Sequence, residues 1–192
     1  MNVEKLFTLV NLILGIVFLS SVCGEKEKEV YLTKLECLNY MPELVRNVSC
    51  YLNETHRTGS INVEFILTQD VEDMKGIYIL TLIRGSYVTN FTSLHLDYCQ
   101  MLSSVEKHFI FKMLTKQLRE TANFPLQCPL KMNTRYYTNG LKINSKYIPS
   151  YMPETNFISD AHLRVKDRKV FRLLVKGRFS RSEFSRNYIK TE

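Results

Sequence analysis

The sequence lacks most of the patterns that carry enzymatic chemistry. Its four histidines are scattered, with no His-x-His or His-Glu-x-x-His spacing that would bind zinc. It has no Gly-x-Ser-x-Gly turn to present a serine nucleophile, and no glycine-rich loop to bind phosphate. These absences predict a protein that is not an enzyme and that holds no cofactor or metal.

Long apolar runs are also absent beyond the first residues of the chain. The run from Leu6 to Leu19 is shorter than the roughly 20 residues that a membrane-spanning helix needs, and the charged residues 25–29 follow it. Lys5 precedes the run, and small residues come after it. Residues 1–24 are therefore predicted to be a cleaved secretory signal and not a membrane anchor, which makes the mature protein extracellular and without a transmembrane span.

Nothing in the rest of the chain marks a division into domains. The mature chain has 192 − 24 = 168 residues, which suits one domain with a real core. It contains no repeat and no Gly/Ser linker. Residues 25–179 are predicted to form one domain, and residues 180–192 a basic C-terminal tail.

The cysteines favour disulfides in an oxidising compartment. Cys23 is removed with the signal, which leaves Cys37, Cys50, Cys99 and Cys128. Three pairings are open; we favour Cys37–Cys50 with Cys99–Cys128, because each pair brackets one short unit. Metal ligation is the alternative, but no two cysteines are two or three residues apart and none has a histidine at finger spacing.

Three glycosylation sequons also indicate export. They place acceptor asparagines at Asn47, Asn53 and Asn90. The backbone around Asn53 and Asn90 is expected to face solvent, and Asn47 is the least certain site because it lies close to Cys50.

The chain is predicted to be mostly strand. Apolar and polar residues alternate over 61–67 and 157–165, as expected for half-buried strands. Residues 77–83 are apolar at both odd and even positions apart from Thr81, which favours a strand that is buried on both faces or that contacts an apolar ligand. Many short strands with one helix predict a β-sandwich.

Two connections in this pattern are specific enough to test. Residues 30–39 and 45–52 are expected to form a first strand pair around Pro42. Asn139-Gly140 is the strongest short hairpin signal in the chain, and residues 141–147 are expected to return from it as a strand.

One helix is predicted between the last two cysteines. Leu102, Val105, Phe109, Met113 and Leu118 recur at helical spacing. Ser103 or Ser104 is the expected N-cap, and Pro125 prevents the helix from continuing much past Asn123. With a Cys99–Cys128 disulfide, this helix would be stapled across the mouth or edge of the strands.

The net charge of +7 is concentrated near the C-terminus. From His162 onward there are ten basic and three acidic residues, 10 − 3 = +7, and the rest is balanced. This predicts either a patch for anionic lipids, sulfated glycans or an acidic partner, or simply the solvated face of a last hairpin and tail. Nucleic acid is not an expected partner, because the protein is exported and no recognition motif is present. The predicted basic patch consists of Arg172, Lys176, Arg178, Arg181 and Arg186.

The cysteine pair early in the mature chain, the Asp97-x-Cys99 entry to the helix and the Asn123-Phe124-Pro125-x-x-Cys128-Pro129 exit resemble a family of secreted insect proteins, the domain of unknown function 1091. The resemblance covers residues 34–179, and the basic tail departs from it. It implies an immunoglobulin-like sandwich of the lipid-recognition type, which binds an apolar ligand between its sheets without catalysis, in a family with chemosensory members.

Two functions are therefore open. The first is a carrier of a lipid, fatty acid, hydrocarbon or pheromone. The second is a solidly packed interaction module that meets a receptor, glycan or anionic surface through its basic hairpin. In the first, the ligand pocket would be lined by Phe65, Leu67, Ile79, Leu82, Phe109, Phe157, Leu163, Phe171 and Leu173.

Overall fold

The structure, a computed structural model, describes residues 28–54, 58–103, 116–144, 146, 148–149 and 151–181. The predicted signal and residues 182–192 of the predicted tail lie outside the described residues. Within the described part, no helix is long and apolar enough to cross a membrane. The division into signal, domain and tail therefore stays a prediction.

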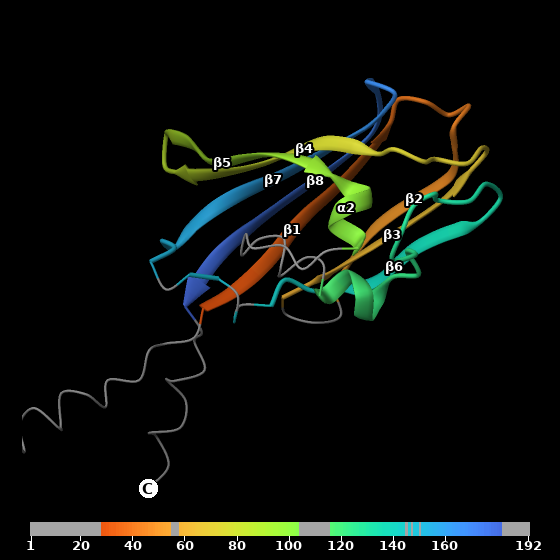
Figure 1. Ribbon diagram of the computed structural model, residues 1–192. Coiled ribbons are helices and arrows are strands. Elements are labelled where there is room, and N and C mark those ends of the chain that lie inside the picture. Colours follow the sequence, from red (N-terminus) through yellow and green to blue (C-terminus); the bar gives the residue numbers. More distant parts are fainter. Residues whose placement is uncertain are drawn as a thin grey trace, which may run out of the picture.

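The described chain folds into two antiparallel sheets that lie face to face (Figure 1). The larger sheet has the strand order β1-β8-β7-β4-β5, and the smaller one has the order β2-β3-β6. The predicted all-β, immunoglobulin-like sandwich is confirmed. The strands are β1 (Lys28–Asn39), β2 (Val45–Asn53), β3 (Ser60–Leu67), β4 (Lys75–Arg84), β5 (Tyr87–Asp97), β6 (Arg135–Leu141), β7 (Thr155–Val165) and β8 (Arg168–Arg181).

The predicted pairing of the first two strands is wrong. β1 pairs with β8 and β2 pairs with β3, so the turn around Pro42 carries the chain from one sheet to the other. The Cys37–Cys50 disulfide joins these two strands across the sandwich. β1 and β2 therefore lie next to each other in different sheets and do not pair within one sheet.

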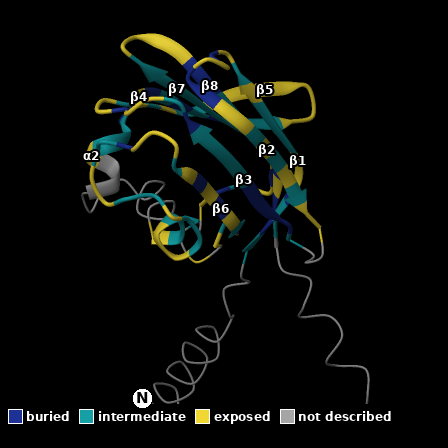
Figure 2. Ribbon diagram, turned by 90° about the vertical axis from the view of Figure 1, so that its right-hand side faces the viewer, coloured by how far each residue is buried: buried dark blue, intermediate teal, exposed yellow. Residues whose placement is uncertain are grey.

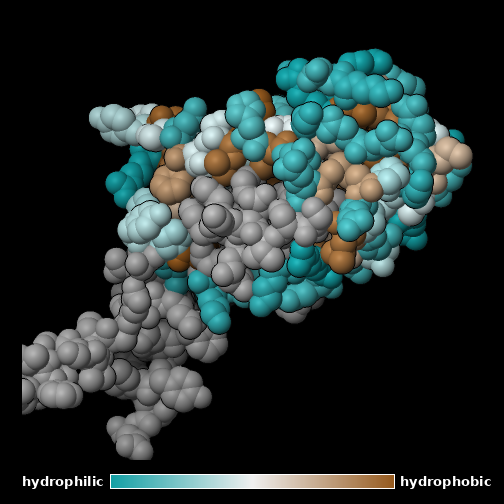
Figure 3. All heavy atoms as spheres, in the orientation of Figure 1, coloured by the Kyte–Doolittle hydropathy of each residue, from teal (hydrophilic) through white to brown (hydrophobic). Residues whose placement is uncertain are grey.

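Alternation along the strands places apolar side chains between the sheets. Figure 2 shows buried residues within the strands and exposed ones on the outside and in the loops. Phe157 is among the most deeply buried side chains, and its ring stacks on Phe179 at 4.5 Å between centroids. A second cluster surrounds Leu44 and Leu130 at the turn after β1. On the face seen in Figure 3, some apolar residues also reach the surface between hydrophilic ones.

Asn139-Gly140 does not form the predicted hairpin turn. Both residues lie inside β6, where its register against β3 shifts between Ile61 and Val63. Gly140 has φ +76°, and its N–H donates to Oδ1 of Asn62 at 2.9 Å. The positive φ that this dipeptide favours serves a bulge here. In addition, described residues 142–144 are not strand, so the predicted return strand over 141–147 is also wrong.

The helical region begins earlier than predicted. Helix α2 (Tyr98–Ser103) starts directly after β5, and the carboxylate of Asp97 accepts a hydrogen bond from the N–H of Gln100 at 2.9 Å. Asp97 is therefore the cap of α2. The predicted cap at Ser103 or Ser104 stays a prediction, because residues 104–115 lie outside the described residues. Residues 116–121 are helical again and end before Pro125, as predicted. Phe109 and the rest of 104–115 lie outside the described residues.

The second predicted disulfide is also confirmed. Cys99 in α2 is bonded to Cys128, which lies in the segment that leads to β6. β5 and β6 are edge strands of different sheets. Cys37–Cys50 therefore joins β1 to β2, whereas Cys99–Cys128 joins α2, which directly follows β5, to the segment that precedes β6.

Candidate ligand cavity

An apolar cavity of about 160 Å³ lies between the two sheets. Its walls come from β3, β6, β7 and β8, from Met74 directly before β4, and from the segment between β5 and β6. Because the smaller sheet has three strands against five, part of the larger sheet's inner face is covered by that connecting segment and not by strands. The cavity is lined by Ile61, Val63, Phe65, Met74, Tyr98, Leu118, Phe124, Thr138, Leu141, Ala161, Leu163, Phe171 and Leu173.

A second, smaller apolar space of about 30 Å³ adjoins the first one. The two share Phe65, Met74, Leu163 and Phe171 as walls. Phe65 lies at the centre of an aromatic group, with its ring centroid 6.0 Å from that of Phe124 and 6.3 Å from that of Phe171. Methionine is unbranched and adapts its shape readily, so Met74 is the most easily rearranged part of the shared wall.

Tyr98 is the unusual residue of this cavity. Its ring packs against Gly76, where an added Cβ would lie 2.9 Å from Cε2 of the ring. Among the described residues, its hydroxyl is a buried side-chain oxygen with no hydrogen-bond partner. Burial raises the pKa of Tyr98, and the neighbouring Tyr78 raises it further, so the hydroxyl keeps its proton at ordinary pH.

Tyr78 is satisfied by comparison. Its hydroxyl accepts a hydrogen bond from Oγ of Ser159 at 3.2 Å, although burial raises its pKa as well. Tyr98 was not predicted as a site residue, because the sequence shows it only as the residue before Cys99. A tyrosine at the junction of a strand and a helix gives no sequence signal of an unpartnered hydroxyl.

The structure brings together about half of the predicted pocket residues. Phe65, Leu163, Phe171 and Leu173 line the larger cavity, and Leu67 lines the smaller one. Phe157 and Leu82 belong to the packed core and line neither space.

Ile79 is on the opposite face of the larger sheet. It alternates with Tyr78 and Leu80, which are buried in the core, so its side chain faces away from the smaller sheet. Apart from Thr81, the run over 77–83 is apolar because the isoleucines of one face of β4 alternate with Tyr78, Leu80 and Leu82 on the other. Ligand binding by the predicted pocket residues stays a prediction.

The three members of the predicted basic patch whose side chains are described, Arg172, Lys176 and Arg178, lie on the outer face of the larger sheet. Arg172 is bound by Asp160 through Nε at 2.8 Å and Nη2 at 2.6 Å. Further along β8, Lys176 is half-buried and Arg178 is exposed. For Arg181 only the backbone is described, and Arg186 lies outside the described residues.

Asp160 is the centre of a partly buried ionic cluster on that face. Nε2 of His162 lies 3.2 Å from its Oδ1, beside the two bonds from Arg172. Burial alone would raise the pKa of Asp160, but the hydrogen bond from Arg172 and the nearby His162 outweigh it and leave the pKa below its usual value. No three His, Cys, Asp or Glu residues in the described part of the chain are arranged to hold a metal ion.

The three predicted glycosylation sites are all exposed. Asn47 has a left-handed backbone with φ +53° at the β2 bulge, Asn53 is the last residue of β2, and Asn90 lies on β5. Their exposure agrees with the expectation that these segments face solvent. The modification itself remains a prediction.

Comparison with known proteins adds one family match. Residues 77–159, from β4 into β7, match the model of a family described as "Protein of unknown function (DUF1091)". This supports the predicted family resemblance over that segment. No curated protein matches the chain.

Among solved structures, the crystal structure of chicken MD-1 complexed with lipid IVa is similar. The match has 13% sequence identity and covers 80% of this chain and 97% of that chain, with a TM-score of 0.38. The two-sheet architecture is established by the strand pairing described above.

Proposed function

We propose that this protein is an extracellular, non-enzymatic carrier that holds an apolar ligand between its two sheets. The observation that carries the proposal is the cavity of about 160 Å³ with almost entirely apolar walls. A packed protein interior contains few voids larger than a water molecule, so a space of this size needs an explanation. Filling by an apolar ligand supplies one.

The energetic case follows from the volume. A closed apolar void of 160 Å³ would cost roughly 4 kcal/mol at about 24 cal/mol per Å³, and this space, which is partly open to solvent, costs less than that when it is empty. Water gains little there because apolar walls offer it few hydrogen bonds, and an engineered apolar cavity of about 150 Å³ stays dry and binds benzene. A hydrocarbon body of similar bulk would recover most of this cost.

A longer chain would use both spaces. Rotation of Met74 would join the cavity of about 160 Å³ to the neighbouring one of about 30 Å³. Each further CH₂ group taken from water is worth about 0.8 kcal/mol, so a fatty or hydrocarbon chain binds without a charged anchor. The resemblance to secreted insect proteins adds a setting, chemosensation, in which the ligand would be a fatty acid, hydrocarbon or pheromone.

The test is to identify what the protein carries. The full chain is secreted from insect cells, purified without detergent and examined by native mass spectrometry, followed by titration with a fluorescent fatty acid. We expect a co-purified apolar molecule, or saturable binding of the probe at one site. If nothing co-purifies and the probe does not bind, the carrier proposal is wrong.

The alternative, a basic interaction module, receives less support from the described residues. Arg172 is engaged by Asp160, so it is not available as part of a basic patch without breaking that pair. Heparin chromatography separates the two functions. Retention that collapses when Arg178, Arg181 and Arg186 become serine would favour the interaction module, whereas unchanged retention would count against it.

A further inference from the structure

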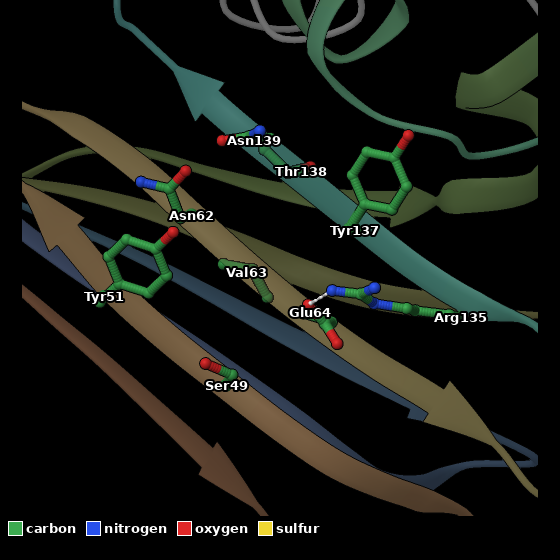
Figure 4. A pocket seen from close by; sticks show the side chains of 9 residues that line it. All are labelled: Ser49, Tyr51, Asn62, Val63, Glu64, Arg135, Tyr137, Thr138 and Asn139. Carbon is green, nitrogen blue, oxygen red and sulfur yellow. Dashed lines mark hydrogen bonds and ion pairs between the residues drawn. The ribbon is translucent and has the colours of Figure 1, made fainter.

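The outer face of the smaller sheet carries a polar hollow, which is separate from the cavity between the sheets. It has a volume of about 380 Å³, and Figure 4 shows the side chains around it. Tyr51 stands on β2 and Tyr137 on β6, on either side of the central strand β3. The hollow is lined by Ser49, Tyr51, Asn62, Val63, Glu64, Arg135, Tyr137, Thr138 and Asn139.

The two tyrosines leave large aromatic surfaces open to solvent. Tyr51 is 56% exposed and Tyr137 is 41% exposed. An aromatic ring offers a flat apolar face and, in tyrosine, a polar edge. Two such rings flanking one hollow fit a ligand that also combines flat apolar faces with polar edges.

The floor of the hollow is polar, and its charges cancel. Glu64 forms an ion pair with Arg135, and this hydrogen bond holds the pKa of the Glu64 carboxyl below its usual value. Asn62 accepts from the N–H of Gly140 at 2.9 Å and donates to the carbonyl of Ser60 at 3.4 Å. A neutral floor does not favour an anion, whereas hydroxyl groups can both donate to and accept from it. Aromatic sides over a neutral polar floor suit a saccharide.

A saccharide attachment point lies beside this hollow. Asn53 is exposed and follows Tyr51 by two residues on β2, so both project from the same face of the sheet. At about 3.3 Å per residue, the two positions are roughly 6.6 Å apart. Tyr51 pairs with Asn62 and Asn53 with Ser60, which places Asn53 at the end of the hollow. Asn53-Glu54-Thr55 is a glycosylation sequon.

We propose that the glycan on Asn53 folds back over the smaller sheet, with its first sugar stacked on the ring of Tyr51. The glycan arrives by transfer from a lipid diphosphate-linked oligosaccharide: the amide nitrogen of Asn53 bonds to the anomeric carbon and loses a proton, and the lipid diphosphate leaves. The proposal shares with the carrier function only the export of the protein. It assigns Tyr51 a role as a glycan-positioning residue.

The first experiment measures the accessibility of individual tyrosines. Full-length protein secreted from insect cells is nitrated with tetranitromethane and mapped by mass spectrometry, beside the Asn53→Gln variant. An aromatic contact of ordinary strength favours the stacked form by roughly 2- to 12-fold, so nitration of Tyr51 should fall by a similar factor in the glycosylated protein. Tyr87, which is 78% exposed on β5, serves as the internal control and should react equally in both.

The matched variants are Asn47→Gln and Asn90→Gln, which remove the other two sequons. Both should leave the protection of Tyr51 intact. The proposal is overturned if Asn53 carries no glycan, if Tyr51 reacts equally with and without it, or if protection depends on Asn47. Binding of the fluorescent fatty acid is measured on the same samples, so failure of the carrier proposal is seen separately.

Discussion

Filling the cavity from within should stabilise the protein and, if the cavity is the ligand site that we propose, exclude the ligand. Ala161 lies on β7 with its side chain in the cavity wall, between Tyr78 on β4 and Leu173 on β8 in the strand register. The substitution Ala161→Leu adds three carbon atoms. At about 0.8 kcal/mol for each buried CH₂, the gain is roughly 2.4 kcal/mol if the new side chain fits.

The same change predicts the size of the measured shift. For a domain of this length, 1 kcal/mol moves the thermal midpoint by about 2–4 °C, so Ala161→Leu should raise it by about 5–10 °C. Affinity for the fluorescent fatty acid should fall at the same time, because the added carbons occupy part of the 160 Å³.

The assay is thermal unfolding followed by circular dichroism, with ligand titration on the same samples. Ser93→Leu is the control, because Ser93 is exposed on β5 and pairs with Ile79 on the outer face of the larger sheet. It should neither stabilise the protein nor change ligand affinity. A lower midpoint for Ala161→Leu together with unchanged ligand affinity would refute the reasoning, since it would mean that the cavity is neither fillable nor the binding site.

Three further changes test the surroundings of the cavity. Gly76→Ala should destabilise the protein by roughly 1–3 kcal/mol or more, because its Cβ would lie 1.9 Å from the backbone oxygen of His162; wild-type stability in urea unfolding would contradict the packing described. Tyr98→Phe should raise the free energy of unfolding of the ligand-free protein by roughly 1–3 kcal/mol, because its buried hydroxyl has no partner in the described part of the chain; a loss of stability would reveal one. The lowered pKa of Asp160 gives a stability contribution that is complete above its ordinary pKa of 3.8 and is lost as the pH falls through the lower folded value. Asp160→Asn should therefore flatten the pH dependence of stability below about pH 4, and an unchanged acid profile would show that the pair with Arg172 contributes nothing.

Much of the fold was predictable because its signals are local. The period-two alternation over 61–67 and 157–165 gave β3 and β7, and neighbouring cysteines gave both disulfides. The local sequence signals failed where the same backbone preference is compatible with two different structures. Asn-Gly supplies a positive φ equally to a turn and to a bulge, and only the hydrogen bond from Gly140 to Asn62 decides between them.

The cavity was only partly predictable, because residues far apart in the sequence together decide whether empty space is left between the sheets. Phe65 and Leu163 were predicted as pocket residues, whereas Ala161, which belongs to the same alternation as Leu163, was not. Its small side chain is ordinary in sequence and becomes informative only beside Tyr98 and Phe124, which come from a different part of the chain. Conversely, Ile79 looked like a pocket residue because β4 is apolar on both faces, and the sequence alone does not indicate which face meets the other sheet.

The position of the two sulfur bridges sets a limit on what the interior can accept. Cys37–Cys50 joins the two sheets at one margin, and Cys99–Cys128 ties the segment after β5 to the segment before β6, so both bridges resist separation of the layers. Met74 lies in the wall that the two apolar spaces share, and its unbranched side chain can adapt its shape. If the protein is a carrier, as we propose, it should select ligands by thickness more than by length. We therefore expect it to bind slender chains of several lengths and to exclude rigid, thick ring systems.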